Sequence, residues 1–134
     1  MLSVNNVSYK YNNRAVLKAV SAQVLGGECL AIVGESGSGK STLLKLIFGQ
    51  MDVDCGTIFW KDQAILGPKN KLVVGHDFMK YVAQEFDLMP YTSVSENIGN
   101  YLSNFYPDDK KSRVKELIEV VELEGVENTK VQFL

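Results

Sequence analysis

Apolar and polar residues alternate through the first 25 residues of the chain. The alternation covers two segments, Leu2 to Tyr9 and Val16 to Leu25, and the turn-forming pair Asn12-Asn13 lies between them. A period of two places every second side chain on the same face of an extended strand. The pattern therefore predicts two antiparallel strands joined by a turn.

The pattern changes after Gly26-Gly27, where a continuous apolar run replaces the alternation. This run, Cys29 to Val33, is typical of a strand buried on both faces in the centre of a parallel sheet. Gly34 to Gly39 follows directly, and from Lys40 to Phe48 the apolar residues recur at helical spacing, ending at Gly49. The sequence thus predicts a strand, a glycine-rich loop and a helix in immediate succession.

Further strands and two helices are expected in the rest of the chain. They are strands at Gly56 to Trp60 and Met79 to Gln84, an irregular region at Asp62 to Asp77, a short helix beginning at Ser93 or Ser95, and an amphipathic helix from Asp108 or Asp109 to about Glu124. Strands followed by helices in this way indicate the α/β class.

The glycine-rich loop carries a phosphate-binding pattern. Gly34-Glu-Ser-Gly-Ser-Gly39-Lys40-Ser41 satisfies G-x-x-x-x-G-K-[ST] between a predicted strand and a predicted helix. Glycines let the backbone turn its N–H groups inward, and the helix N-terminus favours an anion. Lys40 is expected to reach the β- and γ-phosphates and the Ser41 hydroxyl to bind Mg²⁺. The alternative, a chance glycine-rich loop, is disfavoured by the flanking strand and helix.

Along nearly its whole length the chain resembles the ATP-binding domain of ABC transporters, which is a P-loop NTPase. The motifs that carry the resemblance are Val7-Ser-Tyr-Lys-Tyr11, the phosphate loop with Gly49 and Gly56-Thr-Ile after it, and Tyr81-Val-Ala-Gln84 with Pro90, Val94 and Asn97-Ile98 after it. The resemblance implies that Tyr11 stacks on adenine through its π-face. Two alternatives stay open, namely that Tyr9 takes this role or that Tyr11 only packs in the sheet.

The same resemblance assigns Gln84 to the family's Q-loop, where it would contact Mg²⁺ and the attacking water. An amide suits this role because it offers an oxygen to a metal and an N–H to water. The implied catalytic residues are Lys40 and Gln84, and the implied metal ligands are Ser41 and Gln84. The implied nucleotide contacts are Tyr11, Gly34, Glu35, Ser36, Gly37, Ser38, Gly39, Lys40, Ser41 and Thr42.

The resemblance also divides the chain. Residues 1–91 would form the N-terminal antiparallel part and part of the parallel sheet of the ATPase core, and residues 92–134 the beginning of the helical subdomain. Phe133-Leu134 resembles the edge of the L-S-G-G-Q signature, and the Walker B carboxylates and switch histidine would lie after it. His76 lies too early for the switch and is expected to be a solvated loop residue. We therefore expect this segment to bind ATP and Mg²⁺, with hydrolysis requiring the intact protein.

Composition and charge narrow the choice of partners. The 14 basic and 16 acidic residues give a net charge of -2, so no basic excess suggests a nucleic-acid partner. Apolar stretches of about five residues are far below the roughly 20 needed to cross a bilayer, and no secretory signal is apparent. The resemblance implies a transmembrane permease, a second ATP-binding domain and a cytoplasmic location at the inner face of the membrane. A non-transport ABC ATPase acting on ribosomes or DNA is the alternative.

Overall fold

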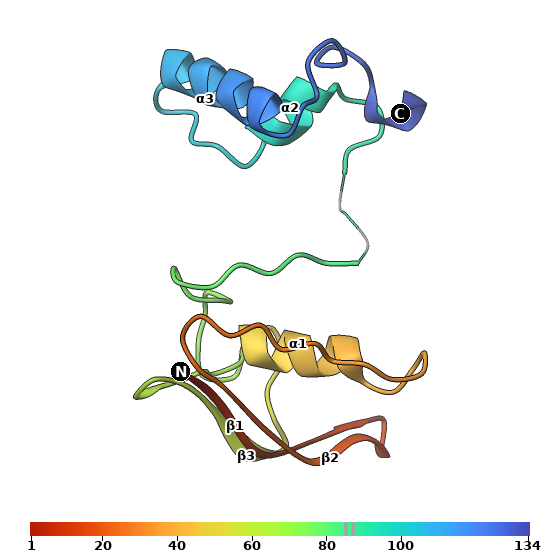
Figure 1. The fold of residues 1–134 in the computed structure, drawn as a ribbon, viewed down its shortest axis with the longest axis vertical. Coiled ribbons are helices and arrows are strands. Elements are labelled where there is room, and N and C mark those ends of the chain that lie inside the picture. Colours follow the sequence, from red (N-terminus) through yellow and green to blue (C-terminus); the bar gives the residue numbers. More distant parts are fainter. Residues whose placement is uncertain (85, 87) are drawn as a thin grey trace. The chain divides into compact units, whose positions relative to one another are not determined.

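The computed structural model describes residues 1–84, 86 and 88–134 (Figure 1), which form two compact units, Met1–Tyr81 and Val82–Leu134. The predicted limit between an ATPase core and a helical subdomain at residue 91 stays a prediction. The first unit contains β1 (Leu2–Tyr11), β2 (Arg14–Val24), α1 (Lys40–Phe48), β3 (Cys55–Trp60) and β4 (Gln63–Ala64). The second contains α2 (Val94–Gly99), α3 (Pro107–Val120) and the 3-10 turn η1 (Val131–Phe133).

The first unit is built on an antiparallel sheet with the strand order β2-β1-β3-β4. In the β1–β2 hairpin, Leu2 lies opposite Val24 and Tyr11 opposite Arg14. Asn12 and Asn13 make the two-residue turn with φ angles of 46° and 64°, a left-handed conformation that asparagine tolerates better than most residues. The predicted N-terminal hairpin is confirmed.

Helix α1 packs on this sheet and closes the core of the first unit (Figure 1). Leu43 and Leu46, three positions apart on one helix face, are buried together with Val4, Val7 and Ile58 of the sheet. The helix ends where Gly49 takes a left-handed conformation, φ 78°, and its N–H donates to the Leu46 carbonyl. The predicted helix and its glycine end are confirmed.

Two predicted strands are wrong in this structure. Cys29 to Val33 and Met79 to Gln84 have no strand conformation, and the sheet contains no parallel pair among the described residues. Val33 and Val82 are 88% and 78% exposed, although their apolar runs predict burial. A strand exists only when neighbouring strands satisfy its backbone groups, and no described residue pairs with either segment.

The second unit is helical, and its helix starts follow from local chemistry. Ser93, one of the two predicted starts, caps α2: its hydroxyl accepts from the N–H of Glu96 while the Glu96 carboxylate accepts from the N–H of Ser93. Helix α3 begins with Pro107 in its first turn, followed by Asp108 and Asp109, which favour a helix N-terminus. Both predicted helices are therefore confirmed, although α3 ends at Val120 and not at about Glu124.

Candidate functional site

The loop over residues 34–39 leads directly into the N-terminus of α1. Gly37 and Gly39 take left-handed φ angles of 80° and 94°, which other residues adopt only under strain. Gly39 is the N-cap of the nine-residue helix, and no side chain caps the first-turn N–H groups. These donors and the helix dipole together suit an anion.

Strand β2 fixes the position of this loop through close contact with Gly39. A Cβ atom on Gly39 would lie 3.0 Å from Cδ2 of Leu17, 3.1 Å from Cγ1 of Val16 and 3.2 Å from the Val16 carbonyl oxygen. Each of these distances is tighter than ordinary van der Waals contact. Glycine is therefore required here twice, once for its φ angle and once for the space.

The Lys40 side chain folds back over the loop that precedes it. Its ammonium donates to the carbonyl oxygens of Gly34 at 2.9 Å and Glu35 at 2.7 Å, with a longer contact of 3.4 Å to Oγ of Ser38. Among the described residues, both ion pairs lie on α3, so Lys40 has no carboxylate partner there. The positive charge is thus held at the loop by neutral oxygens and is available to an anion.

The remaining predicted loop residues lie around this centre. The Ser38 N–H donates to the Glu35 carbonyl at 3.2 Å and closes the turn. Ser41 is exposed in the first turn of α1, and Thr42 beside it is half-buried. The structure therefore brings all nine predicted loop residues, 34–42, together at one helix end.

Tyr11 belongs to the same unit as the loop. Its side chain is 63% exposed at the end of β1, and its strand partner is Arg14, two residues before Val16. At roughly 3.3 Å per residue, two residues span about 7 Å along β2. The exposed ring thus stands on the hairpin that contacts Gly39, whereas Tyr9 is half-buried against the core.

Gln84 lies in the second unit and is exposed. The structure therefore groups Tyr11 with the phosphate loop in the first unit and leaves Gln84 in the other. No cluster of three or more His, Cys, Asp or Glu side chains that could hold a metal exists among the described residues.

One polar residue that sequence reasoning missed organises the second unit. Asn97 is 7% exposed, the only buried polar residue in the described part of the chain. Its Oδ1 accepts from the N–H of Met89 at 2.8 Å, and its Nδ2 lies 3.0 Å from the Met89 carbonyl and 2.7 Å from Oγ1 of Thr92. In the sequence, the signal for this burial is the position of Asn97 between the apolar residues Val94 and Ile98.

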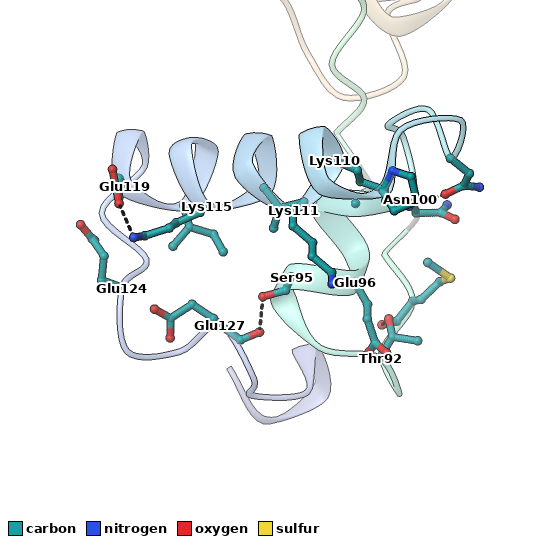
Figure 2. A pocket seen from close by; sticks show the side chains of 16 residues that line it. Thr92, Ser95, Glu96, Asn100, Lys110, Lys111, Lys115, Glu119, Glu124 and Glu127 are labelled. Carbon is teal, nitrogen blue, oxygen red and sulfur yellow. Dashed lines mark hydrogen bonds and ion pairs between the residues drawn. The ribbon is translucent and has the colours of Figure 1, made fainter.

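A cavity of about 870 Å³ lies between α2 and α3 (Figure 2). Met89, Val114 and Ile118 supply apolar surface, whereas charged residues such as Lys111 and Glu127 stand around them. Backbone N–H groups of Gly125 and of Glu127 itself lower the pKa of the Glu127 carboxyl. This cavity therefore combines an apolar lining with charges of both signs.

His76 departs from the expected solvated loop histidine. Its ring is half-buried and stacks on Phe78 with ring centres 4.9 Å apart, and Phe78 stacks in turn on Trp60 at 5.4 Å. Nδ1 lies 3.1 Å from the Lys71 ammonium, while Nε2 is buried with no hydrogen-bond partner among the described residues. Aromatic stacking, which charge and loop composition do not reveal, accounts for the burial.

The chain is similar to known proteins both in sequence and in structure. The family model described as ABC transporter matches residues 17–133. The phosphonates import ATP-binding protein PhnC 2 of Haloarcula marismortui is 37% identical, with all of this chain and 54% of the relative covered. The spermidine/putrescine import ATP-binding protein PotA of Clostridium novyi is 31% identical, with all of this chain and 38% of the relative covered. The chain thus spans about half or less of these relatives' lengths.

The solved structures to which the chain is similar are also ABC transporter cassettes. A dimeric bacterial ABC transporter cassette aligns with a TM-score of 0.73 at 25% identity, covering all of this chain and 63% of the cassette. A post-hydrolysis cassette dimer bound to ADP and Pi aligns with a TM-score of 0.69 at 25% identity and the same coverage. These matches confirm the predicted P-loop NTPase class of the ABC type. The chain belongs to the ABC transporter family and forms part of its ATP-binding cassette.

Proposed function

We propose that this chain holds ATP with Mg²⁺ as part of the ATP-binding subunit of an ABC importer. The observation that carries the proposal is the geometry at α1, where uncapped helix N–H groups and the Lys40 ammonium converge on one glycine loop. Together they offer a concave set of donors with a net positive charge, which suits a polyphosphate. Tyr11 would add a stacking surface for the base.

The expected divalent ion fits the donors that are present. The exposed Ser41 hydroxyl and the exposed Gln84 amide are both hard oxygen donors, the type that Mg²⁺ prefers. Bound Mg²⁺ would supply charge neutralisation at the phosphates. This chain's own contribution is to hold the γ-phosphate with Lys40 and the loop N–H groups, and to orient water through the Gln84 amide.

Hydrolysis, transport and assembly belong to the intact protein in this proposal. It would hydrolyse ATP as a pair of cassettes, in keeping with the dimeric cassettes among the structural neighbours. Both curated relatives are import ATP-binding proteins, which favours import over an action on ribosomes or DNA. No helix in the described part of the chain is long and apolar enough to cross a membrane. The proposed partner is a permease at the inner face of the membrane, because both relatives are import ATP-binding proteins.

A surface for this permease is proposed next to Gln84. Phe86, Leu88 and Tyr91 are 67%, 50% and 74% exposed, and exposed large apolar side chains can mark an interaction site. Met89 belongs to the same stretch and also lines the 870 Å³ cavity. Residues 85 and 87 of this stretch lie outside the described residues. An apolar helix of the permease would bury these side chains.

Titration calorimetry of the purified chain with ATP, with and without Mg²⁺, tests the binding proposal. We expect saturable ATP binding that weakens when the divalent ion is chelated. Inorganic sulfate serves as a control for a nonspecific anion site and should compete only at far higher concentration. The proposal would be refuted if the chain bound no ATP although its circular dichroism spectrum showed folded helix and sheet.

A further inference from the structure

Arg14 is a cation at the tip of the N-terminal hairpin, and no contact within the fold explains its charge. It is the first residue of β2, directly after the Asn12-Asn13 turn, and its side chain is exposed. Both ion pairs among residues 1–84, 86 and 88–134 lie on α3, so Arg14 has no carboxylate partner in that part of the chain. Its guanidinium, a planar group with five N–H donors, is therefore available to a ligand.

The strand register places Arg14 on the same face of the hairpin as Tyr11. The two residues lie directly opposite each other in the β1–β2 pairing. Side chains of directly opposite residues share one face of a sheet, with Cβ atoms about 5 Å apart. Lys10 and Ala15 form the next pair and therefore belong to the other face. The proposed base contact thus has a guanidinium beside it.

This face of the hairpin is the one that meets the phosphate loop. Tyr9 lies two residues before Tyr11 on β1, so it shares the same face, and its partner on β2 is Leu17. A Cβ atom on Gly39, the N-cap of α1, would lie only 3.0 Å from Cδ2 of Leu17. Helix α1 packs on the same face of the sheet (Figure 1). The surface that carries Arg14 is therefore continuous with the loop.

Arg14 also lies on the strand that contacts the loop. The sheet order β2-β1-β3-β4 makes β2 an edge strand, and both residues that crowd Gly39, Val16 and Leu17, belong to β2. Arg14 precedes Val16 by two residues, about 7 Å along the strand. Tyr11 lies one strand further from the loop, on β1. A ligand that extends from the loop to Tyr11 would therefore pass Arg14.

The covalent order of a nucleotide identifies the group that Arg14 would meet. A nucleoside triphosphate runs from the γ-phosphate through the β- and α-phosphates to the ribose and the base. With the β- and γ-phosphates at Lys40 and the base at Tyr11, the α-phosphate is the anion between them. A guanidinium can hold a phosphate through two parallel N–H bonds, which the compact ammonium of lysine cannot reproduce.

We propose that Arg14 is a nucleotide-binding residue whose guanidinium holds the α-phosphate between Tyr11 and the phosphate loop. The inference rests on the proposed function for the placement of the nucleotide. It adds a specificity that the loop alone does not give: ligands with a third phosphate gain affinity from Arg14, whereas pyrophosphate, which fills only the β and γ positions, does not. Adenine and guanine nucleotides gain equally, because the contact is made to phosphate.

Arg14→Gln tests this contact by removing the charge and keeping a polar side chain. Titration calorimetry of the full chain with Mg²⁺ compares ATP, GTP, inorganic tripolyphosphate and pyrophosphate. We expect the affinities for ATP, GTP and tripolyphosphate to fall about tenfold, since one charge-assisted contact is lost, and the affinity for pyrophosphate to stay unchanged. Lys10→Gln is the matched control, because Lys10 is an exposed cation on the opposite face of the same hairpin. It should leave all four affinities unchanged.

Arg14→Lys provides a second variant that keeps the charge. It should retain more ATP affinity than Arg14→Gln, and circular dichroism should show both variants folded as the wild type, because the side chain is exposed. Equal affinities for Arg14→Lys and Arg14→Gln would contradict a contact that depends on charge.

Several results would overturn the role of Arg14. They are an unchanged ATP affinity in Arg14→Gln, the same loss in Lys10→Gln, an equal loss for pyrophosphate, or a loss for nucleotides that tripolyphosphate does not share. A loss confined to GTP would indicate a contact to the base edge and also contradicts the proposal. If a folded wild-type chain binds no ATP, the proposed function itself falls. If ATP binding is lost in Lys40→Ala but kept in Arg14→Gln, only the role of Arg14 falls.

Discussion

Removing the Lys40 ammonium is the most direct perturbation of the phosphate loop. In the structure it donates at 2.9 Å and 2.7 Å to the carbonyls of Gly34 and Glu35. Bound ATP would replace these neutral oxygens with charged phosphate oxygens, and hydrogen bonds between charged groups are stronger than those to neutral acceptors. Lys40→Ala therefore removes more free energy from the complex than from the free chain.

The size of the effect follows from two bonds. Hydrogen bonds to charged groups contribute about 1.5–3 kcal/mol each, and the carbonyl bonds given up in the free chain offset part of this. A net loss of about 3 kcal/mol of binding free energy remains. Because each 1.4 kcal/mol changes a dissociation constant tenfold, we expect ATP affinity to fall about a hundredfold.

Titration calorimetry with Mg²⁺ and ATP measures this change, and Lys45→Ala is the matched control. Lys45 lies on the same helix, five residues further on, and contacts none of the loop carbonyls in the structure. Its substitution should alter affinity less than twofold. Equal ATP affinity for wild type and Lys40→Ala would refute the assignment of the loop. If Lys45→Ala lost as much ATP affinity as Lys40→Ala, the loss would reflect the removal of a positive charge in general and not a contact made by Lys40.

Three further predictions concern the base, the metal and pH. Tyr11→Ala should weaken ATP and GTP alike, by about 1–3 kcal/mol, because stacking uses the π-face of either base; competition titrations would expose a loss confined to ATP, which contradicts stacking alone. Ser41→Ala should shrink the gain in ATP affinity that Mg²⁺ gives and leave metal-free binding unchanged, a comparison made by titration with and without chelator. Ser93 lowers the pKa of Glu96 through its backbone N–H and then its hydroxyl, whereas the backbone N–H groups of Gly125 and of Glu127 itself lower the pKa of Glu127. The ionised carboxylates therefore stabilise the second unit above pH 4.5, and this contribution is lost as the pH falls through the lowered pKa values. Melting curves of wild type and Glu96→Gln between pH 7 and pH 3 check this sign, since Glu96→Gln should melt with a weaker dependence on pH.

Local sequence signals predicted the parts of the fold that local chemistry decides. Asn12-Asn13 specifies a tight turn, Gly49 ends α1, and the Ser93 to Glu96 spacing starts α2, because each depends on residues a few positions apart. The phosphate loop was predictable for the same reason. Its pattern contains all the residues whose backbone must turn.

Features that depend on distant partners escaped sequence reasoning. Cys29 to Val33 has the composition of a buried strand, yet a strand also needs neighbours that its own residues do not encode. The burial of Asn97 was not predicted, because it depends on hydrogen bonds to Met89 and Thr92, which precede α2. The burial of His76 depends on Phe78, which in turn stacks on Trp60 of β3, far earlier in the chain.

The contact between Gly39 and β2 has a consequence for how this protein can vary. Side-chain size at Val16 and Leu17 is limited by the loop, and the loop residue is limited by them, so substitutions at these positions are epistatic. Val16→Ala should relieve part of the crowding in Gly39→Ala, yet the φ of 94° at Gly39 would still oppose any side chain. Reshaping the hairpin beside Tyr11, the proposed base contact, should therefore also disturb the proposed phosphate loop, so that a substitution there is expected to change both proposed contacts together.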